Sequence, residues 1–502
     1  MNDVSFWLQE RLSAGSIALL GSLLALVLVL IPWPVGMVLA SGVIFVLAVV
    51  RWPVLLPLGL ILSVPLQDVV RFSFGGIAIT ATQAFILLAI LLGPLIVLRR
   101  RIRLCYPGIA AATTVLIAIQ VLSLGFARNT LYGVATIYRW TAALLVFLLI
   151  IHLVESRRSV VVLSVGLVVA AFGEVAFGTL QSALGLAPPS FAISGGWYRA
   201  YGTFGQPNPF AGYLEMVGLW LAAVAFWSAR SAQRLWIRYG RVRLGGFLSS
   251  GSTRRAAIGA TILASVLVAG ALASLGGIVL SFSRGAWLGT SAGLATFVLL
   301  APRGLRRSAL VIGAIVLAVL ALGGWNELPA AVRERMTQLV NYGRPFDVRD
   351  VQLTDANWAI VERMAHWQAA WAMFLDSPLT GVGAGNFSVR FPDYSPHPVF
   401  RLARGHAHNY YLHILAELGI PGLLAYLMIF ALALALAVRV WRTRHNEFDR
   451  ALAGGALAVT TAIMVHNLVE NLHELHLSMQ LFSVWALVWR AQAGWGTKRE
   501  AI

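Results

Sequence analysis

Two histidines near the start of a long apolar run are the residues best suited to chemistry in this sequence. His406 and His408 precede Asn409 in segment 401–424, which joins a long polar stretch to a run long enough to cross a bilayer. Histidine titrates near neutral pH and can accept a proton from a hydroxyl group. Glu417 follows His408 by about two and a half helical turns, so it should face the other side of the helix. The segment predicts an acid–base site at a membrane–water boundary.

The composition is that of a polytopic membrane protein. The 502 residues are 59% hydrophobic and 12% charged, with a net charge of +18 and a mean hydropathy of +0.79. This excludes a soluble protein of this size. The arginines stand in short clusters between apolar runs, a pattern typical of topology signals and contact with anionic lipid headgroups, not of nucleic-acid binding. Cys105 is the single cysteine, which excludes an internal disulfide and a cysteine metal cage.

Apolar runs of spanning length predict an all-α, polytopic transmembrane bundle of about 12–14 helices. The runs lie at roughly 15–31, 35–50, 53–70, 77–98, 108–126, 134–153, 160–183, 207–227, 256–280, 285–301, 308–324, 409–438, 451–468 and 474–491. The second and third runs are short and flanked by prolines, so a broken or re-entrant pair is the alternative there, as it is around Ser283. We expect the first run to be a retained span and not a cleaved signal peptide.

The arginine clusters predict the orientation of the chain. They fall in alternate connections, at 99–103, 157–158, 230–255, 303–307 and 442–450, which the positive-inside rule assigns to the cytoplasm. We therefore expect N-terminal transmembrane helices over 1–324, an extracytoplasmic loop over 325–408 and C-terminal transmembrane helices over 409–502. Two amphipathic helices are expected in that loop, at 328–340 and 359–375, lying on the membrane face.

Four arginines stand at the outward ends of apolar runs, where an unpaired charge is costly. They are Arg128, Arg139, Arg199 and Arg284. A guanidinium can bind phosphate oxygens through two parallel hydrogen bonds, so these residues predict an anion site, with interfacial snorkelling as the alternative. Arg199 and Arg284 stand in the unusual sequences RAYGTFGQPNPFAGYL and SFSRGAWLG. The Pro-Asn-Pro element at Asn208 indicates a helix start that either faces a phosphate or is simply capped.

Metal binding is the alternative role for the histidines. Three of them lie at 406–413 and three more at 466–476, but none has the spacing of a helical zinc motif. We expect no metal and no cofactor, and a purely structural role for the histidines stays open. The glycine-rich segment 381–386 lacks the preceding strand and the lysine of a phosphate-binding loop, so it predicts a flexible turn.

Four segments in the same order resemble the O-antigen ligase and polymerase superfamily of bacterial inner-membrane glycosyltransferases. They read RAYGTFGQPNPFAGYL, SRGAWLG, WQAAWAMFLDSPLTGVGAGNF and HAHNYYLHILAELGIPG, and the resemblance covers residues 190 to 440 approximately. It implies transfer of a glycan from undecaprenyl pyrophosphate to an acceptor hydroxyl on the periplasmic side, without metal or nucleotide. It also implies a base and a set of pyrophosphate contacts. The implied base is His408, the implied contacts are Arg199, Arg284, Arg128 and Arg139, and the further candidates are His406, Asn409, Glu417 and Asn208.

The expected reaction suits these residue types, because a pyrophosphate leaving group needs fixed cations and an attacking hydroxyl needs a base. Attack opposite the pyrophosphate would invert the anomeric carbon. The acceptor stays open between a lipid A core sugar (a ligase), a second lipid-linked glycan (a polymerase) and a protein hydroxyl (a protein O-oligosaccharyltransferase). A secondary transporter is the non-enzyme alternative, although the sequence has no matching interrupted halves. If His408 is the base, the rate should rise with pH through its pKa, near 6.5 for an unperturbed imidazole.

Overall fold

The computed structural model describes residues 22, 33–74, 77–193, 196–244, 250–341, 346–354, 357–403 and 405–496. It divides into two compact units, residues 1–56 and 57–502, which we describe separately. The first unit contains α3 (Trp33–Arg51), whose proline at position 34 stands in the first turn, where a proline is tolerated. Apart from residue 22, the run predicted at 15–31 lies outside the described residues. Helix α4 (Leu55–Ser63) has 9 residues, too few to cross a bilayer, as its flanking prolines indicated.

The second unit is helical apart from one small antiparallel hairpin, β1 (Arg71–Phe74) with β2 (Ile77–Thr80). Its long helices are α5 (Ala81–Arg99), α6 (Gly108–Ser123), α7 (Thr130–Leu153), α8 (Arg157–Ala183), α9 (Pro207–Leu244), α10 (Ser250–Leu280), α11 (Arg284–Leu300), α12 (Arg303–Val319), α17 (Tyr410–Thr443), α18 (Glu447–His466) and α19 (Leu477–Ala493). Among the described residues, nine helices are long and apolar enough to cross a membrane. The predicted all-α transmembrane class is therefore confirmed, although the predicted number of spans was higher.

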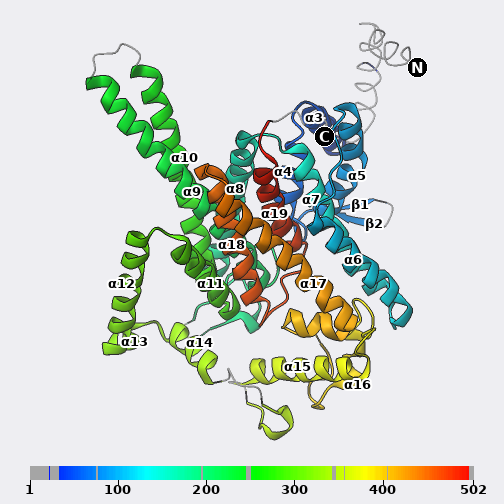
Figure 1. Cartoon of the computed structure of the whole chain (residues 1–502). Coiled ribbons are helices and arrows are strands. Elements are labelled where there is room, and N and C mark those ends of the chain that lie inside the picture. Colours follow the sequence, from blue (N-terminus) through cyan, green and yellow to red (C-terminus); the bar gives the residue numbers. More distant parts are fainter. Residues whose placement is uncertain are drawn as a thin grey trace. The chain divides into compact units, whose positions relative to one another are not determined.

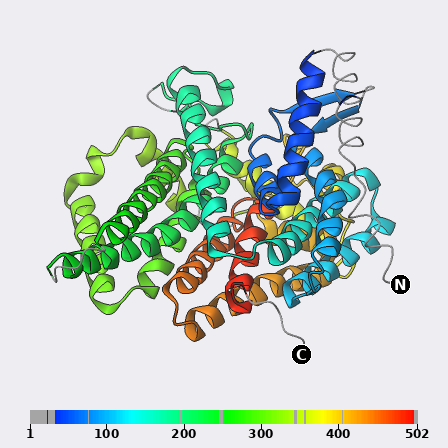
Figure 2. The ribbon, with the colours of Figure 1, turned by 90° about the horizontal axis from the view of Figure 1, so that it is seen from above.

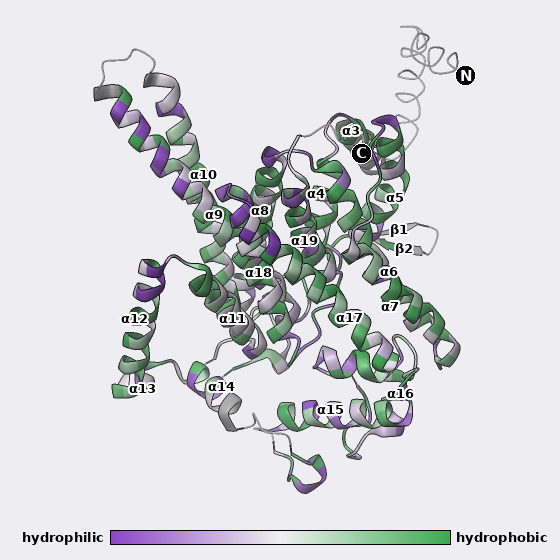
Figure 3. Cartoon of the chain, viewed as in Figure 1, coloured by the Kyte–Doolittle hydropathy of each residue, from purple (hydrophilic) through white to green (hydrophobic). Residues whose placement is uncertain are grey.

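The helices of this unit pack through small residues. Helices α9 and α10 run side by side in both views (Figure 1, Figure 2), and α18 packs against α9, α11 and α17. Gly289 lets α11 approach α18 so closely that a Cβ there would lie 2.7 Å from the carbonyl oxygen of Ala462. Close backbone approach at small residues is how helices associate where no water drives them together. Figure 3 shows the resulting pattern, with apolar residues along the long helices and hydrophilic residues at the joined ends of α9 and α10.

The loop between α12 and α17 contains α13 (Trp325–Glu327), α14 (Ala330–Asn341), α15 (Trp358–Asp376) and α16 (Phe387–Tyr394). The two expected amphipathic helices are present as α14 and α15. The apolar face of α15 is buried in protein: Val361, Ala365 and Ala369 pack into a cluster with Phe387 and Phe391 of α16. Figure 1 shows α14 near the N-terminal end of α11 and α15 beneath α17. The loop is thus folded onto the helical bundle, and it delivers side chains to the ends of the spanning helices.

Candidate active site

Four arginines from four separate segments line one buried polar cavity of about 70 Å³. Arg199 comes from the loop before α9, Arg284 is the first residue of α11, Arg335 lies on α14 and Arg363 lies on α15. The other lining residues are Asn208, Phe282, Ser283, Gly285, Ala359, His466, Val469 and Glu470. So many guanidiniums in one cavity can be stabilised by an anionic ligand, because like charges held together at low dielectric repel one another.

The turn between α10 and α11 positions the first two arginines. Arg199 donates from Nε to the carbonyl of Ser281 at 2.8 Å and from Nη2 to Asn208 Oδ1 at 2.9 Å. Ser283 is the N-cap of α11, and its hydroxyl accepts from the N–H of Ala286, which places Arg284 in the first helical turn. A Cβ at Gly285 would lie 2.5 Å from the ring of His466, so only glycine allows α18 this close to Arg284. The reversal that the sequence predicted at Ser283 is therefore a tight, buried turn.

Burial and then repulsion from three neighbouring guanidiniums lower the pKa of Arg199 to about 9. Burial is also the main reason that the pKa of Arg335 is lowered. Arg199 remains charged at neutral pH despite this shift, and guanidiniums in proteins generally stay protonated. Their positive charge is thus available to an anion, and the cost of holding it in the fold would be offset when the anion binds.

His408 occupies a strained turn directly before α17. Its backbone φ is +52°, a left-handed conformation that costs a residue with a side chain free energy and that persists where the surroundings enforce it. Asn409 enforces it from one side as the N-cap of α17, accepting from the N–H of Leu412 at 3.1 Å. Trp367 of α15 donates to the carbonyl of His408 at 3.3 Å, and the ring of His366 stacks on that of His408 with centroids 5.5 Å apart.

The hydrogen bonds of the two predicted histidines separate their roles. His406 Nδ1 accepts the backbone N–H of His408 at 3.1 Å, so the proton of a neutral His406 ring must be on Nε2, which faces the carboxylate of Glu470 at 3.4 Å. Nδ1 of His408 contacts the same carboxylate at 3.1 Å. Within the described residues no hydrogen-bond partner is found for Nε2 of His408. His408 thus has a ring nitrogen available to accept a proton, whereas both nitrogens of His406 are engaged.

Glu470, in the turn between α18 and α19, connects the histidines with the arginine cavity. Its Oε1 faces His406 and His408, and its Oε2 accepts from Asn208 Nδ2 and lies 3.5 Å from Nη2 of Arg363. Burial would raise the pKa of this carboxyl, but His408, His406 and Arg363 lower it well below its usual range. An ionised Glu470 requires that His408 direct its Nδ1 proton toward it, because a carboxylate only accepts hydrogen bonds.

Burial, with a further contribution from His406, lowers the pKa of His408 to about 4, and Glu470 acts in the opposite direction. The imidazole is therefore neutral at pH 7, and its Nε2 can accept a proton because Nδ1 is turned toward Glu470. This differs from the value near 6.5 used for an unperturbed side chain. The physical reason is that the loop folds over the histidine and removes it from water, which disfavours the charged ring.

His406, His408 and Glu470 can also present one ligand atom each within 4.8 Å of one another. Two imidazoles and a carboxylate are a donor set that suits a divalent transition metal. This cluster is not visible as a motif, because Glu470 lies far along the chain from the histidines. A metal held by these three residues would bind the carboxylate of Glu470, which here accepts the hydrogen bond of His408, so the two arrangements compete for the same group.

The remaining predicted residues lie elsewhere. Arg128 forms an ion pair with Asp393 at 3.1 Å on the surface. Arg139 of α7 donates to Thr136 at 3.1 Å and lines a separate cavity of about 20 Å³ with Glu417 and His413. The structure thus brings Arg199, Arg284, Asn208, His406 and His408 together and leaves Arg128, Arg139 and Glu417 apart.

Glu417 holds the glycine-rich segment in place. Its two oxygens accept the backbone N–H groups of Gly385 at 2.8 Å and Phe387 at 2.9 Å. Gly381, Gly383 and Gly385 all have positive φ, and a Cβ at Gly381 would lie 2.2 Å from the backbone of Glu417. The expectation of a flexible turn was wrong, because the segment is buried against α17 at close backbone distance.

Sequence reasoning missed Arg335, Arg363 and Glu470. The two arginines belong to the amphipathic helices, where a charged residue is normally explained by contact with water. Glu470 stands in the short connection NLVENLHELH. Its histidines were considered as metal ligands, whereas its carboxylates were assigned no role. A signal was present, because a buried acidic residue at a span end requires a partner, and arginines stood at span ends on the same side.

Part of the chain is similar to known proteins. Residues 269–427 match the protein family described as O-Antigen ligase. This segment contains Arg284, Arg335, Arg363 and His408. A stretch of 99 residues is 27% identical to the teichuronic acid biosynthesis protein TuaE of Bacillus subtilis (strain 168), and it covers 20% of this chain and 20% of that protein. The chain is thus a multi-pass membrane protein that carries an O-antigen ligase family domain over residues 269–427.

Proposed function

We propose that the protein transfers a glycan from undecaprenyl pyrophosphate to an acceptor hydroxyl. The observation that carries the proposal is the position of Glu470, whose one oxygen contacts the base candidate His408 and whose other oxygen contacts the cavity of four arginines. A base and an anion site joined by one carboxylate match the two requirements of this reaction, which are a deprotonated nucleophile and a stabilised pyrophosphate.

In the proposed mechanism the arginines bind the oxygens of the pyrophosphate. The acceptor oxygen attacks the anomeric carbon as Nε2 of His408 takes its proton, and the bond from that carbon to the pyrophosphate oxygen breaks with its electron pair. The charge that develops on the leaving group falls on the guanidiniums, which are already in place and need no reorganisation. Glu470 stabilises the imidazolium that forms. Attack from the face opposite the leaving group inverts the configuration at the anomeric carbon, and no metal takes part.

The proposed location is the bacterial inner membrane, with the site facing the periplasm. The arginine clusters support this, because they lie at the helix ends away from the site, and such clusters mark the cytoplasmic side. The acceptor we propose is a glycolipid of the lipid A core type, as in an O-antigen ligase. A polymerase reaction with a second lipid-linked glycan is the competing candidate, since the similar protein from Bacillus subtilis is named for teichuronic acid biosynthesis.

Reconstitution tests the proposal. Purified protein is supplied, in chelator, with an undecaprenyl-pyrophosphate-linked glycan and, separately, with a lipid A core acceptor, a second donor molecule or a serine-containing peptide. We expect one acceptor to gain a glycosidic bond of inverted configuration, with release of undecaprenyl pyrophosphate. Retained configuration would contradict the mechanism, and movement of the donor across a membrane without transfer would favour a transporter.

A second measurement is independent of the sugar and the acceptor. Undecaprenyl pyrophosphate without a glycan should raise the unfolding temperature of the unmodified protein, because a ligand that binds only the folded state stabilises it. The Arg199→Lys, Arg284→Lys double variant should lose this response, whereas Arg128→Lys should keep it. An equal rise in unfolding temperature in all three proteins would show that the arginine cavity does not bind the pyrophosphate.

A further inference from the structure

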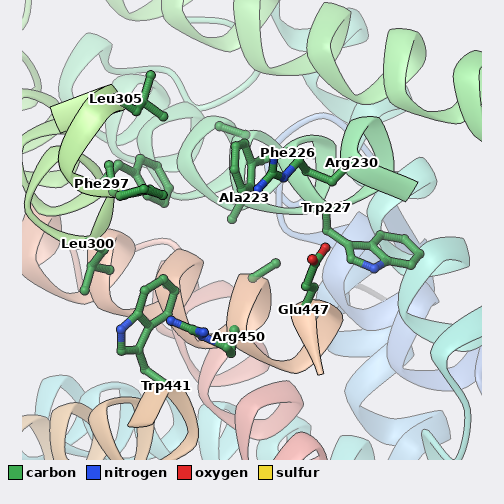
Figure 4. Close-up of a pocket in the computed structure, with 15 residues that line it drawn as sticks. Ala223, Phe226, Trp227, Arg230, Phe297, Leu300, Leu305, Trp441, Glu447 and Arg450 are labelled. Carbon is green, nitrogen blue, oxygen red and sulfur yellow. The ribbon is translucent and has the colours of Figure 1, made fainter. Parts of the chain in front are cut away.

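A larger cavity lies between α9, α11, α17 and α18, away from the candidate active site (Figure 4). Its volume is about 390 Å³, within the range of pockets that hold small molecules. Its walls are mostly apolar and aromatic. The lining residues are Ala222, Ala223, Phe226, Trp227, Arg230, Phe297, Leu300, Ala301, Pro302, Leu305, Trp441, Glu447, Arg450, Ala451 and Gly454.

Three helices separate this cavity from the active site by about the thickness of a bilayer. Helix α9 has Asn208 at the active site and Trp227 at the cavity. Helix α11 runs from Arg284 to Leu300, and α18 runs in the opposite direction, from Glu447 at the cavity to His466 at the site. At 1.5 Å per residue these stretches measure roughly 24–29 Å, close to the 30 Å of a hydrocarbon core. The cavity therefore lies at the opposite membrane surface.

Two arginines at this cavity form no close ion pair among the described residues. Arg450 lies over the ring of Trp441 at 4.6 Å, and Arg230 lies over the ring of Phe226 at 5.8 Å. Within the described part of the chain no carboxylate lies within 4 Å of either guanidinium. Glu447 lines the same cavity and pairs with Arg234 at 2.5 Å, and its carboxylate also attracts Arg230 and Arg450 from a greater distance. Two exposed cations, each held on an aromatic face, thus stand beside an apolar cavity.

We propose that this cavity binds an anionic glycerophospholipid of the arginine-rich leaflet. The phosphate would lie between Arg230 and Arg450, and an acyl chain would enter the apolar part lined by Phe297 and Leu300. Charge complementarity favours this occupant, because Arg230, Arg234 and Arg450 share the single carboxylate of Glu447, and a lipid without net charge would leave the excess positive charge in place. The tryptophans suit the same position, since their amphipathic rings prefer the depth of the headgroups. The lipid is distinct from the lipid-linked donor, which we place at the other surface.

Native mass spectrometry of the full chain in detergent tests the proposal, with phosphatidylglycerol and phosphatidylethanolamine of equal chain length as probes. We expect phosphatidylglycerol to be retained in preference, and the Arg230→Gln, Arg450→Gln double variant to bind it about thirtyfold more weakly. The matched control is Arg303→Gln, Arg307→Gln, which removes the same charge from exposed positions of α12 outside the cavity. Equal weakening in the control, or equal retention of the two lipids by the unmodified protein, would overturn the proposal.

Two further experiments test the contribution of the lipid headgroup and that of its acyl chain separately. Ala451→Trp fills the apolar part and leaves both arginines in place, so it should also reduce retention of phosphatidylglycerol. Inorganic phosphate should not displace the lipid, because it cannot use the apolar walls. Full retention in Ala451→Trp, or displacement by phosphate, would show that the cavity does not hold an acyl chain. These two experiments, and the lipid preference of the unmodified protein, still test the proposal if the Arg230→Gln, Arg450→Gln double variant fails to fold.

Discussion

Two buried clusters in this protein contain the same three residue types and differ in the partners of their carboxylates. One joins Glu470 with His408 and four arginines, and the other joins Glu417 with His413 and Arg139. Among the described residues, the carboxylate of Glu470 accepts one backbone N–H, that of the next residue, and otherwise faces the side chains of Asn208, Arg363 and the two histidines. The carboxylate of Glu417 accepts two backbone N–H groups and fixes a turn. The comparison teaches that the partners of a buried carboxylate, more than its neighbours in sequence, indicate whether it serves a reaction or the fold.

The largest effect is expected at His408. His408→Ala removes the proposed base and should lower the transfer rate about a hundredfold or more, because general base catalysis contributes at least that factor. Donor binding should persist, since the arginines are unchanged. The measurement is the single-turnover rate with saturating donor, and His445→Ala, an exposed histidine outside both clusters, is the control. A loss below tenfold would show that His408 is not the general base.

The next effect is expected at the arginines. Arg199→Lys and Arg284→Lys should each lower transfer about tenfold to a hundredfold, because an ammonium group keeps the charge but cannot form the forked hydrogen bonds of a guanidinium. Arg128→Lys is the matched control, and its exposed ion pair predicts a change within about twofold. Full activity in both Arg199→Lys and Arg284→Lys would assign them to interfacial snorkelling.

A smaller effect is expected at Glu470, which acts through His408. Glu470→Gln keeps an acceptor for the imidazole N–H but loses the charge that stabilises the imidazolium, so kcat should fall about tenfold with a smaller change in KM. Glu470→Asp, which restores the charge, should recover part of the rate. If the two variants lose activity only in proportion to lost folded protein, the role of Glu470 is structural.

A substitution in the cluster of Glu417, His413 and Arg139 should lower the stability of the fold more than the transfer rate. In Glu417→Gln the amide NH₂ would face a backbone N–H that now has a carboxylate partner, which should destabilise the fold by about 1–3 kcal/mol. Unfolding temperature in detergent is the readout, together with transfer per folded molecule, which should change only severalfold. A loss of transfer as large as that of Glu470→Gln, at an unchanged unfolding temperature, would erase the distinction between the clusters.

Much of the fold could be predicted from the sequence, because spanning helices depend on runs of apolar residues and on local capping. The reversal at Ser283 and the two helices of the long loop were predicted on such local grounds. The site was only half predictable. His408, Arg199 and Arg284 stand out because they interrupt apolar sequence, whereas Glu470 and Arg363 become site residues only when α15 and the turn after α18 meet. Nothing local distinguishes Glu417 from Glu470, so their different roles depend on the tertiary contacts.

In the proposed mechanism His408 acts as a neutral base held by Glu470, and the pH dependence of kcat/KM in chelator is the sharpest test of this role. This quantity reports the pKa of the free enzyme. Because burial lowers the pKa of His408 to about 4, the imidazole stays neutral, and the rate stays level, as the pH falls from neutrality until it approaches that value. Activity should return when the pH is restored. A fall centred near 6.5, the value of a free imidazole, would contradict the buried base. Loss of activity in chelator that zinc restores would replace it with a metal site at His406, His408 and Glu470.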